Sequence, residues 1–250
     1  MLTHEQRVDR LDGLIEFFEG LSDEDLRRPV PACPGWDIGN VVAHIGYAAM
    51  LVWIVPTTHA GWSTLDMGGL QRSMGDGRGA EVFPGVMRTL SLLLRSHSPD
   101  DPAVVVCGDQ TWGGLARLAT AEVAVHRLDC LEALGPAPKT DTAMDTAMDS
   151  DHALDALDWT TSTWLPKLAP RAAPMPEGRL VLRAATRGED TSTEFEVGSG
   201  DEVASVEGAP LELLRYLWGR RVEVEPEGDL ELAGSWRDLT PKTTRVDARH

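Results

Sequence analysis

The spacing of apolar residues predicts that roughly the first 135 residues form helices joined by loops. Within residues 3–19, apolar side chains recur every three or four positions and charged residues occupy the opposite face. This stripe consists of Val8, Leu11, Leu14, Ile15 and Phe18. Further helices are predicted at about 37–55, 81–97, 114–134 and 150–167. Asp37 is placed to cap the second helix, and Pro56 stops it.

Turn-forming residues fill the segments between these helices. The sequence SDEDL begins at Ser22, where a serine followed by acidic residues predicts a short capped helix. The segment RRPVPACPGW at 27–36 contains three prolines and a glycine, which exclude regular structure. Residues 57–80 are rich in glycine and are predicted to form a long loop. The tandem TAMD-TAMD within 136–150 indicates a local duplication on the surface, in a linker or at a helix start.

The hydrophobic pattern changes from helical to alternating in the second half of the chain. The predicted elements are strands at 179–186, 193–197 and 202–206 and a helix at 209–218. A turn at 187–190 joins the first two strands, and strand-like VEVE and LELAG segments precede a polar tail. We place a boundary near 170–178. The fold class is therefore predicted as α+β, with a helical bundle at 1–170 and a small α/β domain at 178–250.

Composition and charge restrict the classes of partner. With 42% apolar and 25% charged residues in a chain of 250, the sequence is typical of a folded globular protein. The net charge of −17 disfavours DNA, RNA and acidic membranes as partners. The three cysteines form no CxxC pair, and the charged N-terminus lacks the apolar core of a signal peptide. The longest apolar run, at about 41–55, is too short to span a membrane. These features favour a cytoplasmic protein with reduced thiols.

The candidate chemistry lies on the second and fourth predicted helices. His44 stands among apolar residues in VVAHI, and Glu122 and His126 stand in EVAVH, where a spacing of four places both on one helix face. Two imidazoles and a carboxylate from facing helices are a plausible ligand set for a catalytic zinc, which keeps one coordination position open. A hydrogen-bonded core histidine and a surface ion pair are the alternative interpretations of these residues. The set also suits iron or nickel.

Two longer motifs enclose these residues. CPGWDIGNVVAH at 33–44 and EVAVHRLD at 122–129 resemble, in this order, the signature motifs of the mycothiol-dependent maleylpyruvate isomerase family. ASVEGAPLELLRYLWGR at 204–220, followed by GDLEL, is similar to the small C-terminal domain of that family. The resemblance implies a DinB-like four-helix bundle at the N-terminus, with His44, Glu122 and His126 as the metal ligands.

The resemblance also implies roles for residues near the ligands. Trp36 is expected to pack the loop that enters the second helix. Arg127 and Asp129 are candidates to orient the ligands through hydrogen bonds, and a pair on the helix surface is the alternative. Cys33 is expected to be structural, since the thiol chemistry of the family belongs to the cofactor. In the WGR motif, Arg220 is the candidate catalytic residue, placed to meet an anionic group of the substrate. The sequence identifies no cofactor-binding residues.

The implied function is that of a metal-dependent enzyme that uses mycothiol as its thiol cofactor. A metal-activated thiolate adds to an electrophilic small molecule, either reversibly in a maleylpyruvate-type cis–trans isomerase or permanently in an S-transferase. Two alternatives remain. A zinc-dependent hydrolase would use the same ligands without a thiol, and a non-catalytic module would bind only a metal or a small molecule.

Overall fold

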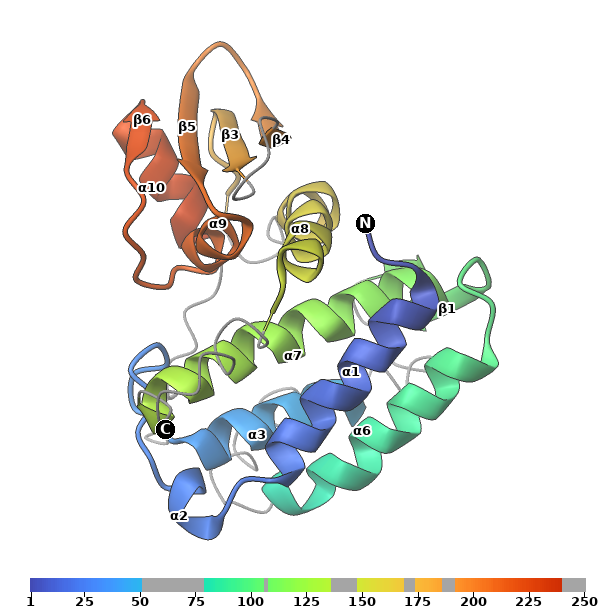
Figure 1. Cartoon of the computed structure of the whole chain (residues 1–250). Coiled ribbons are helices and arrows are strands. Elements are labelled where there is room, and N and C mark those ends of the chain that lie inside the picture. The colour runs from blue at the N-terminus through green and yellow to red at the C-terminus, as the bar shows by residue number, and fades with distance from the viewer. Residues whose placement is uncertain (51–78, 106–107, 136–147, 169–173, 186–191, 240–250) are drawn as a thin grey trace. The chain divides into compact units, whose positions relative to one another are not determined.

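The computed structural model describes residues 1–50, 79–105, 108–135, 148–168, 174–185 and 192–239. Contacts divide these residues into two compact units. The helical unit comprises the described residues between 3 and 135, and the mixed unit comprises residues 1–2 and those from 148 onward. Both helices and strands are present, so the predicted α+β class is confirmed. Figure 1 shows the elements with the labels used below.

Long helices form most of the helical unit (Figure 1). In chain order its elements are α1 (His4–Glu19), α2 (Asp23–Leu26), α3 (Ile38–Ala48), α6 (Gly79–Ser96), β1 (Pro102–Val105), β2 (Gly108–Thr111) and α7 (Trp112–Leu134). Helices α1, α3 and α6 each contact α7, and α6 also packs on α1 and α3. The antiparallel pair β1–β2 directly precedes α7. This pair was not predicted from the sequence.

Caps and apolar stripes explain where these helices form. The Thr3 and Asp37 side chains each accept a hydrogen bond from the backbone three residues later, as helix N-caps do. The whole predicted stripe of α1 is buried. Helix α7 is buried on nearly every side, as expected of a helix surrounded by others. It ends at Gly135, whose φ of 84° favours glycine.

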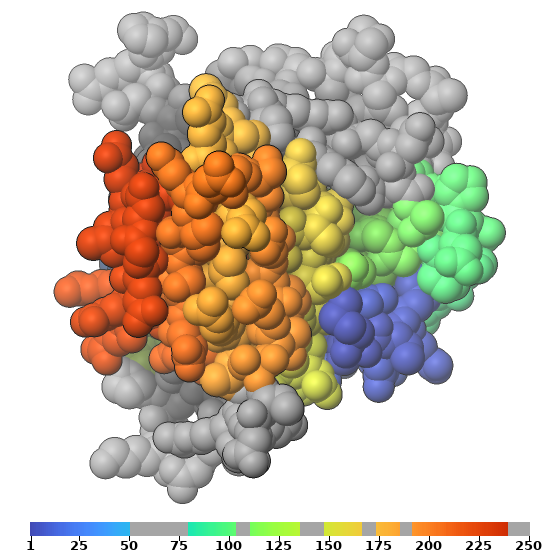
Figure 2. Space-filling model, turned by 90° about the horizontal axis from the view of Figure 1, so that it is seen from above, coloured from blue at the N-terminus to red at the C-terminus, as the bar shows by residue number. Residues whose placement is uncertain are grey.

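The mixed unit combines helices with a four-stranded sheet of order β4-β3-β5-β6. Its elements are α8 (Ser150–Trp159), η2 (Thr160–Leu168), β3 (Gly178–Ala185), β4 (Ser192–Ser199), β5 (Val203–Gly208), α9 (Pro210–Leu217), β6 (Pro226–Gly228) and α10 (Leu230–Asp238). Strand β3 pairs antiparallel with β4 and parallel with β5, and β6 is antiparallel to β5. Helices α9 and α10 contact β3 and β5. In Figure 2, red α10 lies beside the orange strands.

Three strand predictions are confirmed, and two are wrong, one of them for a clear local reason. The LELAG segment was expected to be a strand but forms the start of α10. The Asp229 side chain accepts a hydrogen bond from the Leu232 backbone amide and so caps a helix. Leu232, Ala233 and Trp236 are the buried residues of α10, which is a helical spacing. VEVE is likewise not a strand, and β6 begins just after it at Pro226.

The helix predicted at 150–167 changes its geometry half-way. It is α-helical up to Trp159 and π-helical in η2. Where the geometry changes, the hydroxyls of Thr160 and Thr161 donate to the carbonyls one turn earlier. Contacts group α8 and η2 with the sheet, whereas the sequence placed them with the first helices. Domains at 1–170 and 178–250 remain a prediction.

Several expectations fall on residues outside those described. These are residues 57–78 of the predicted loop, most of the TAMD repeat, the turn at 187–190, nearly all of the polar tail and the end of the second predicted helix. The last two residues predicted as loop, 79 and 80, instead begin α6. Among the described helices, none is long and apolar enough to cross a membrane.

Candidate metal centre

His44 lies in the second turn of α3, and hydrogen bonds at the N-terminus fix where this helix starts. The Asp37 side chain accepts from the Asn40 backbone amide at 2.8 Å, and the Asn40 side chain accepts from the Asp37 amide at 3.1 Å. The indole of Trp36, just before this cap, lies against the His44 imidazole, with ring centroids 5.4 Å apart. Trp36 is buried, so the predicted packing role is consistent with its surroundings. The cap and the indole together orient the first candidate ligand.

Glu122 and His126 lie one turn apart on α7. His126 Nε2 is 3.5 Å from Glu122 Oε1, as the spacing of four predicts. Their neighbours on this helix are mostly buried apolar residues, such as Val123 and Val125. Such surroundings make an unpaired carboxylate costly. The side chain of Glu122 must therefore be satisfied by the groups that face it.

The structure brings the three candidate ligands together. His44 Nε2 lies 3.3 Å from the same Glu122 Oε1 that faces His126. The two imidazole rings meet edge to face, with centroids 5.1 Å apart. One donor atom from each residue lies within 4.8 Å of the others. The side chains of His44 and Glu122 are 24% and 16% exposed, and that of His126 only 3%, so the group opens toward solvent on the side of His44 and Glu122.

Proton affinities in the group are strongly coupled. Burial acts to raise the pKa of Glu122, but hydrogen bonds from His126 and His44 outweigh it and hold that pKa below its usual range. Burial acts to lower the pKa of His126, but its contacts with Asp129, Cys33 and Glu122 raise it well above the ordinary value. The carboxylate is therefore charged at neutral pH, and His126 faces negative charge on both sides of its ring.

A second cluster lies behind His126. Asp129 Oδ2 is 3.1 Å from His126 Nδ1, the ring nitrogen that does not face Glu122. The Cys33 thiol donates to the same Oδ2 at 3.8 Å. Arg127 occupies a different environment, since its guanidinium lies 4.9 Å from the centroid of the Phe17 ring. The structure therefore distinguishes two residues that were grouped together on the basis of the sequence: Asp129 contacts a candidate ligand, whereas Arg127 stacks on an aromatic ring.

Sequence reasoning did not predict the contact between Cys33 and Asp129. The two residues belong to different motifs, and only the packing of the 27–36 loop on α7 joins them. The CPGW motif was the one signal in the sequence that pointed to this loop, because its proline and glycine predict a fixed turn next to the candidate ligands.

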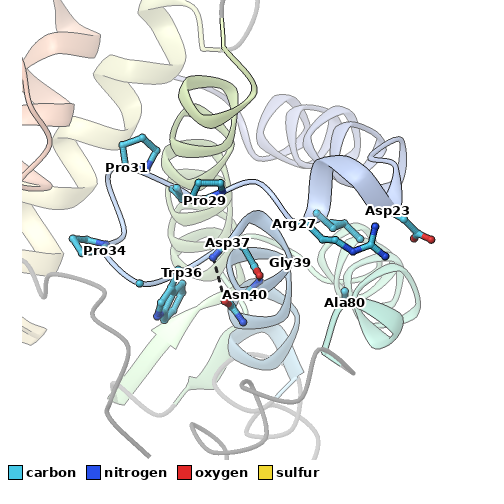
Figure 3. A pocket seen from close by; sticks show the side chains of 13 residues that line it. Asp23, Arg27, Pro29, Pro31, Pro34, Trp36, Asp37, Gly39, Asn40 and Ala80 are labelled. Atoms are coloured by element: carbon cyan, nitrogen blue, oxygen red, sulfur yellow. Dashed lines mark hydrogen bonds between the residues drawn. The ribbon is translucent and has the colours of Figure 1, made fainter.

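A surface pocket lies beside the start of α3 (Figure 3). Its lining comes from α2, the loop before α3, the first turn of α3 and Ala80 of α6, and it includes Trp36 and Arg27. None of the three candidate ligands lines it. Trp36 therefore stands between this pocket and His44, and the pocket is not the metal centre itself.

Arg220, the candidate catalytic residue, belongs to the mixed unit. Its side chain is buried, and Nη1 donates to the Trp218 carbonyl at 2.7 Å. The Arg220 carbonyl accepts from Arg237 Nη2 at 3.1 Å. These bonds fix the end of α9, and contact between Arg220 and a substrate stays a prediction.

The sequence matches the family model described as mycothiol maleylpyruvate isomerase N-terminal domain over residues 9–130. That span contains all three candidate ligands, Cys33 and Asp129. The N-terminal part of the chain, residues 9–130, belongs to the mycothiol-dependent maleylpyruvate isomerase family. The predicted resemblance is thereby confirmed.

Solved structures show the same fold for this family member. A crystal structure of the mycothiol-dependent maleylpyruvate isomerase matches with a TM-score of 0.64 and 18% identity, covering 92% of this chain and 95% of that one. A histidine-to-alanine mutant of that isomerase matches over the same shares with a TM-score of 0.66 and 18% identity. No curated protein matches the sequence. At 18% identity, this likeness establishes only that the chain has the same fold, and it covers residues of both units.

Proposed function

We propose that this chain is a metal-dependent enzyme that uses mycothiol, with His44, Glu122 and His126 as its metal ligands. The observation that carries the proposal is the convergence of two imidazole nitrogens and one carboxylate oxygen, from α3 and α7, within 4.8 Å. In this proposal α1, α3, α6 and α7 form a DinB-like four-helix bundle around the ligands. The division into domains at 1–170 and 178–250 belongs to the same proposal.

The residues present fit a divalent metal in number, type and spacing. A tetrahedral zinc ion with bonds of roughly 2.1 Å separates its ligand atoms by about 3.4 Å. Glu122 Oε1 lies 3.3 Å from His44 Nε2 and 3.5 Å from His126 Nε2, close to that separation. Three protein ligands with an accessible side are the arrangement of catalytic rather than structural zinc sites. A metal would also neutralise the carboxylate that α7 places among apolar residues.

The family membership supports the choice of a thiol reaction. A divalent metal at such a site acts as a Lewis acid and lowers the pKa of a bound thiol, which makes a thiolate available at neutral pH. The chain's own contribution is to hold the two imidazoles and the carboxylate and to leave one side accessible. The solved relative is a maleylpyruvate isomerase. We therefore propose cis–trans isomerisation of an electrophilic small molecule as the first activity to test, and S-transfer as the variant in which the thiol is not released.

Metal content and thiol-dependent turnover test the proposal together. Wild type should contain about one zinc per chain and should isomerise maleylpyruvate only when mycothiol is added. His126→Ala should lose both properties. A matched control is His4→Ala, because His4 Nε2 bonds to the Leu94 carbonyl at 2.8 Å and lies outside the ligand group.

The possible results separate the competing functions. Wild type without metal, or His126→Ala with full metal content, would refute the ligand assignment. Turnover of an ester or amide without added thiol would favour the hydrolase. Metal binding with thiol-dependent consumption of another electrophile would favour an S-transferase.

A further inference from the structure

Two groups of potential metal ligands share His126. The first is His44, Glu122 and His126, and the second is Cys33, His126 and Asp129. The groups use opposite sides of one imidazole, since Nε2 faces Glu122 and Nδ1 faces Asp129. The structure thus poses a choice between a second metal site and a hydrogen-bonded support for the first.

Burial distinguishes the two groups. All three members of the second group are buried, with Cys33 0% and Asp129 2% exposed. An ion held by these three residues would lack the exposed side that His44 and Glu122 give the first group. Two hydrogen bonds within the second group instead end on Asp129. Cys33 and His126 both approach Oδ2 of Asp129, so a single carboxylate oxygen receives two donors.

We propose that Asp129 is a positioning residue for the metal ligand His126 and that Cys33 in turn positions Asp129. The inference rests on the proposed function, because it assumes a metal at His44, Glu122 and His126. Asp129 accepts a hydrogen bond from the Nδ1–H group of His126, which leaves the lone pair of Nε2 directed at the metal. Carboxylates that hold metal-binding histidines in this way fix both the tautomer and the angle of the ring.

The 27–36 loop explains why a cysteine stands at position 33. The Cys33 amide donates to the Val30 carbonyl at 3.0 Å, and the Trp36 amide donates to the Cys33 carbonyl at 2.9 Å. Gly35, with φ of 83°, allows the tight turn between them. This closed loop presents the Cys33 thiol to Asp129 and the Trp36 indole to His44. One short segment therefore reaches both ligand imidazoles: Trp36 packs on His44, and Cys33 contacts both Asp129 and His126.

Zinc affinity, measured by competition with a chromophoric chelator, tests the inference. Outer groups of this kind typically contribute 10- to 100-fold in affinity. Asp129→Asn should weaken zinc binding by about that factor, because the amide can donate to Nδ1 and so favours the wrong tautomer. Cys33→Ala should weaken it by a smaller factor, and Cys33→Ser, which keeps a donor, should retain more affinity than Cys33→Ala.

Cys130→Ala is the matched control. Cys130 is as buried as Cys33 and adjoins Asp129 in sequence, but it is the Cys33 thiol that donates to the Asp129 carboxylate. Cys130→Ala also removes a buried thiol, and its zinc affinity should stay at the wild-type value. Thermal unfolding in excess chelator shows whether each variant is folded. If Asp129→Asn does not fold, the zinc affinities of Cys33→Ala and Cys130→Ala are compared instead. Weaker binding in Cys33→Ala alone supports the inference, and equal binding overturns it.

The outcomes separate this inference from the proposed function. If the wild-type protein binds no metal, both the inference and the proposed function are refuted. Wild type that binds zinc, with Asp129→Asn and Cys33→Ala binding equally well, overturns the inference and leaves the function intact. Cobalt-substituted wild type supplies a spectroscopic test. A near-ultraviolet thiolate-to-cobalt band that disappears in Cys33→Ser would place the ion in the second group, which also overturns the inference.

Discussion

The imidazole rings of His44 and His126 meet edge to face, with centroids 5.1 Å apart and planes inclined by 80°. The rings belong to α3 and α7, and both face the same carboxylate oxygen of Glu122. Neither helix carries the complete ligand set. The site therefore exists only while α3 and α7 are packed together, and a ligand that binds it must stabilise that packing.

Removal of the metal should consequently lower the stability of the helical unit. An ion that binds only the folded chain stabilises it by about 4 kcal/mol when its free concentration is 1,000 times its Kd. We expect a strong chelator to lower the unfolding temperature of wild type and zinc to restore it. Differential scanning calorimetry measures both changes. His44→Ala should unfold at the same temperature with and without chelator, and a chelator effect of wild-type size in that variant would contradict the ligand assignment.

Metal binding should release a proton at neutral pH. The contacts of His126 raise its pKa well above the ordinary value, so the metal-free chain holds a proton there that a metal must displace. Isothermal titration calorimetry in buffers of different ionisation enthalpy counts that proton. We expect about one proton per zinc at pH 7 and fewer as the pH rises. A count near zero at pH 7 would show that His126 is already neutral.

The same shifts predict how the metal-free chain responds to pH. The raised pKa of His126 stabilises the fold below the ordinary value of 6.5, and this contribution is lost as the pH rises through the folded-state value. The lowered pKa of Glu122 stabilises the fold above 4.5, and that contribution is lost as the pH falls. Both contributions to stability are fully present between pH 4.5 and pH 6.5. Urea unfolding in chelator should therefore show its stability maximum in this window, and excess zinc should move the maximum to higher pH.

Short-range patterns in the sequence were enough to predict much of this molecule. A spacing of four predicted that Glu122 and His126 share a face of α7, and the Asp37 cap predicted the start of α3. The meeting of α3 with α7 came from the family resemblance, since no local pattern relates His44 to Glu122. The LELAG segment was misread because its alternation of leucine and glutamate also fits a helix, and the deciding residues, Asp229 and Trp236, flank it. The link from Cys33 to Asp129 depends on tertiary packing alone.

Arg220→Ala should separate structural from catalytic roles of this arginine. Its buried guanidinium donates to the Trp218 carbonyl, and a lost hydrogen bond of this kind costs about 1.5–3 kcal/mol of unfolding free energy. If Arg220 also meets an anionic substrate, KM should rise at a temperature where the variant is fully folded, while metal content stays at wild type. Steady-state kinetics with chemical denaturation measures both effects. An unchanged KM in a folded, metal-loaded variant would leave Arg220 with a structural role only.

Gly198→Ala tests whether the predicted domains fold independently. Gly198 lies on β4 with φ of 89°, and a Cβ there would clash with the Gly178 carbonyl oxygen and with the Trp236 ring of α10. This strain should lower the stability of the mixed unit by about 2 kcal/mol or more. The matched control is Gly234→Ala, because Gly234 lies within α10 with nothing within 4 Å of its added Cβ, and should be neutral or stabilising by up to about 1 kcal/mol. If 178–250 is an independent domain, calorimetry should show one transition lowered by Gly198→Ala and another that responds to zinc. A single transition that moves with both changes would show that the two parts unfold together.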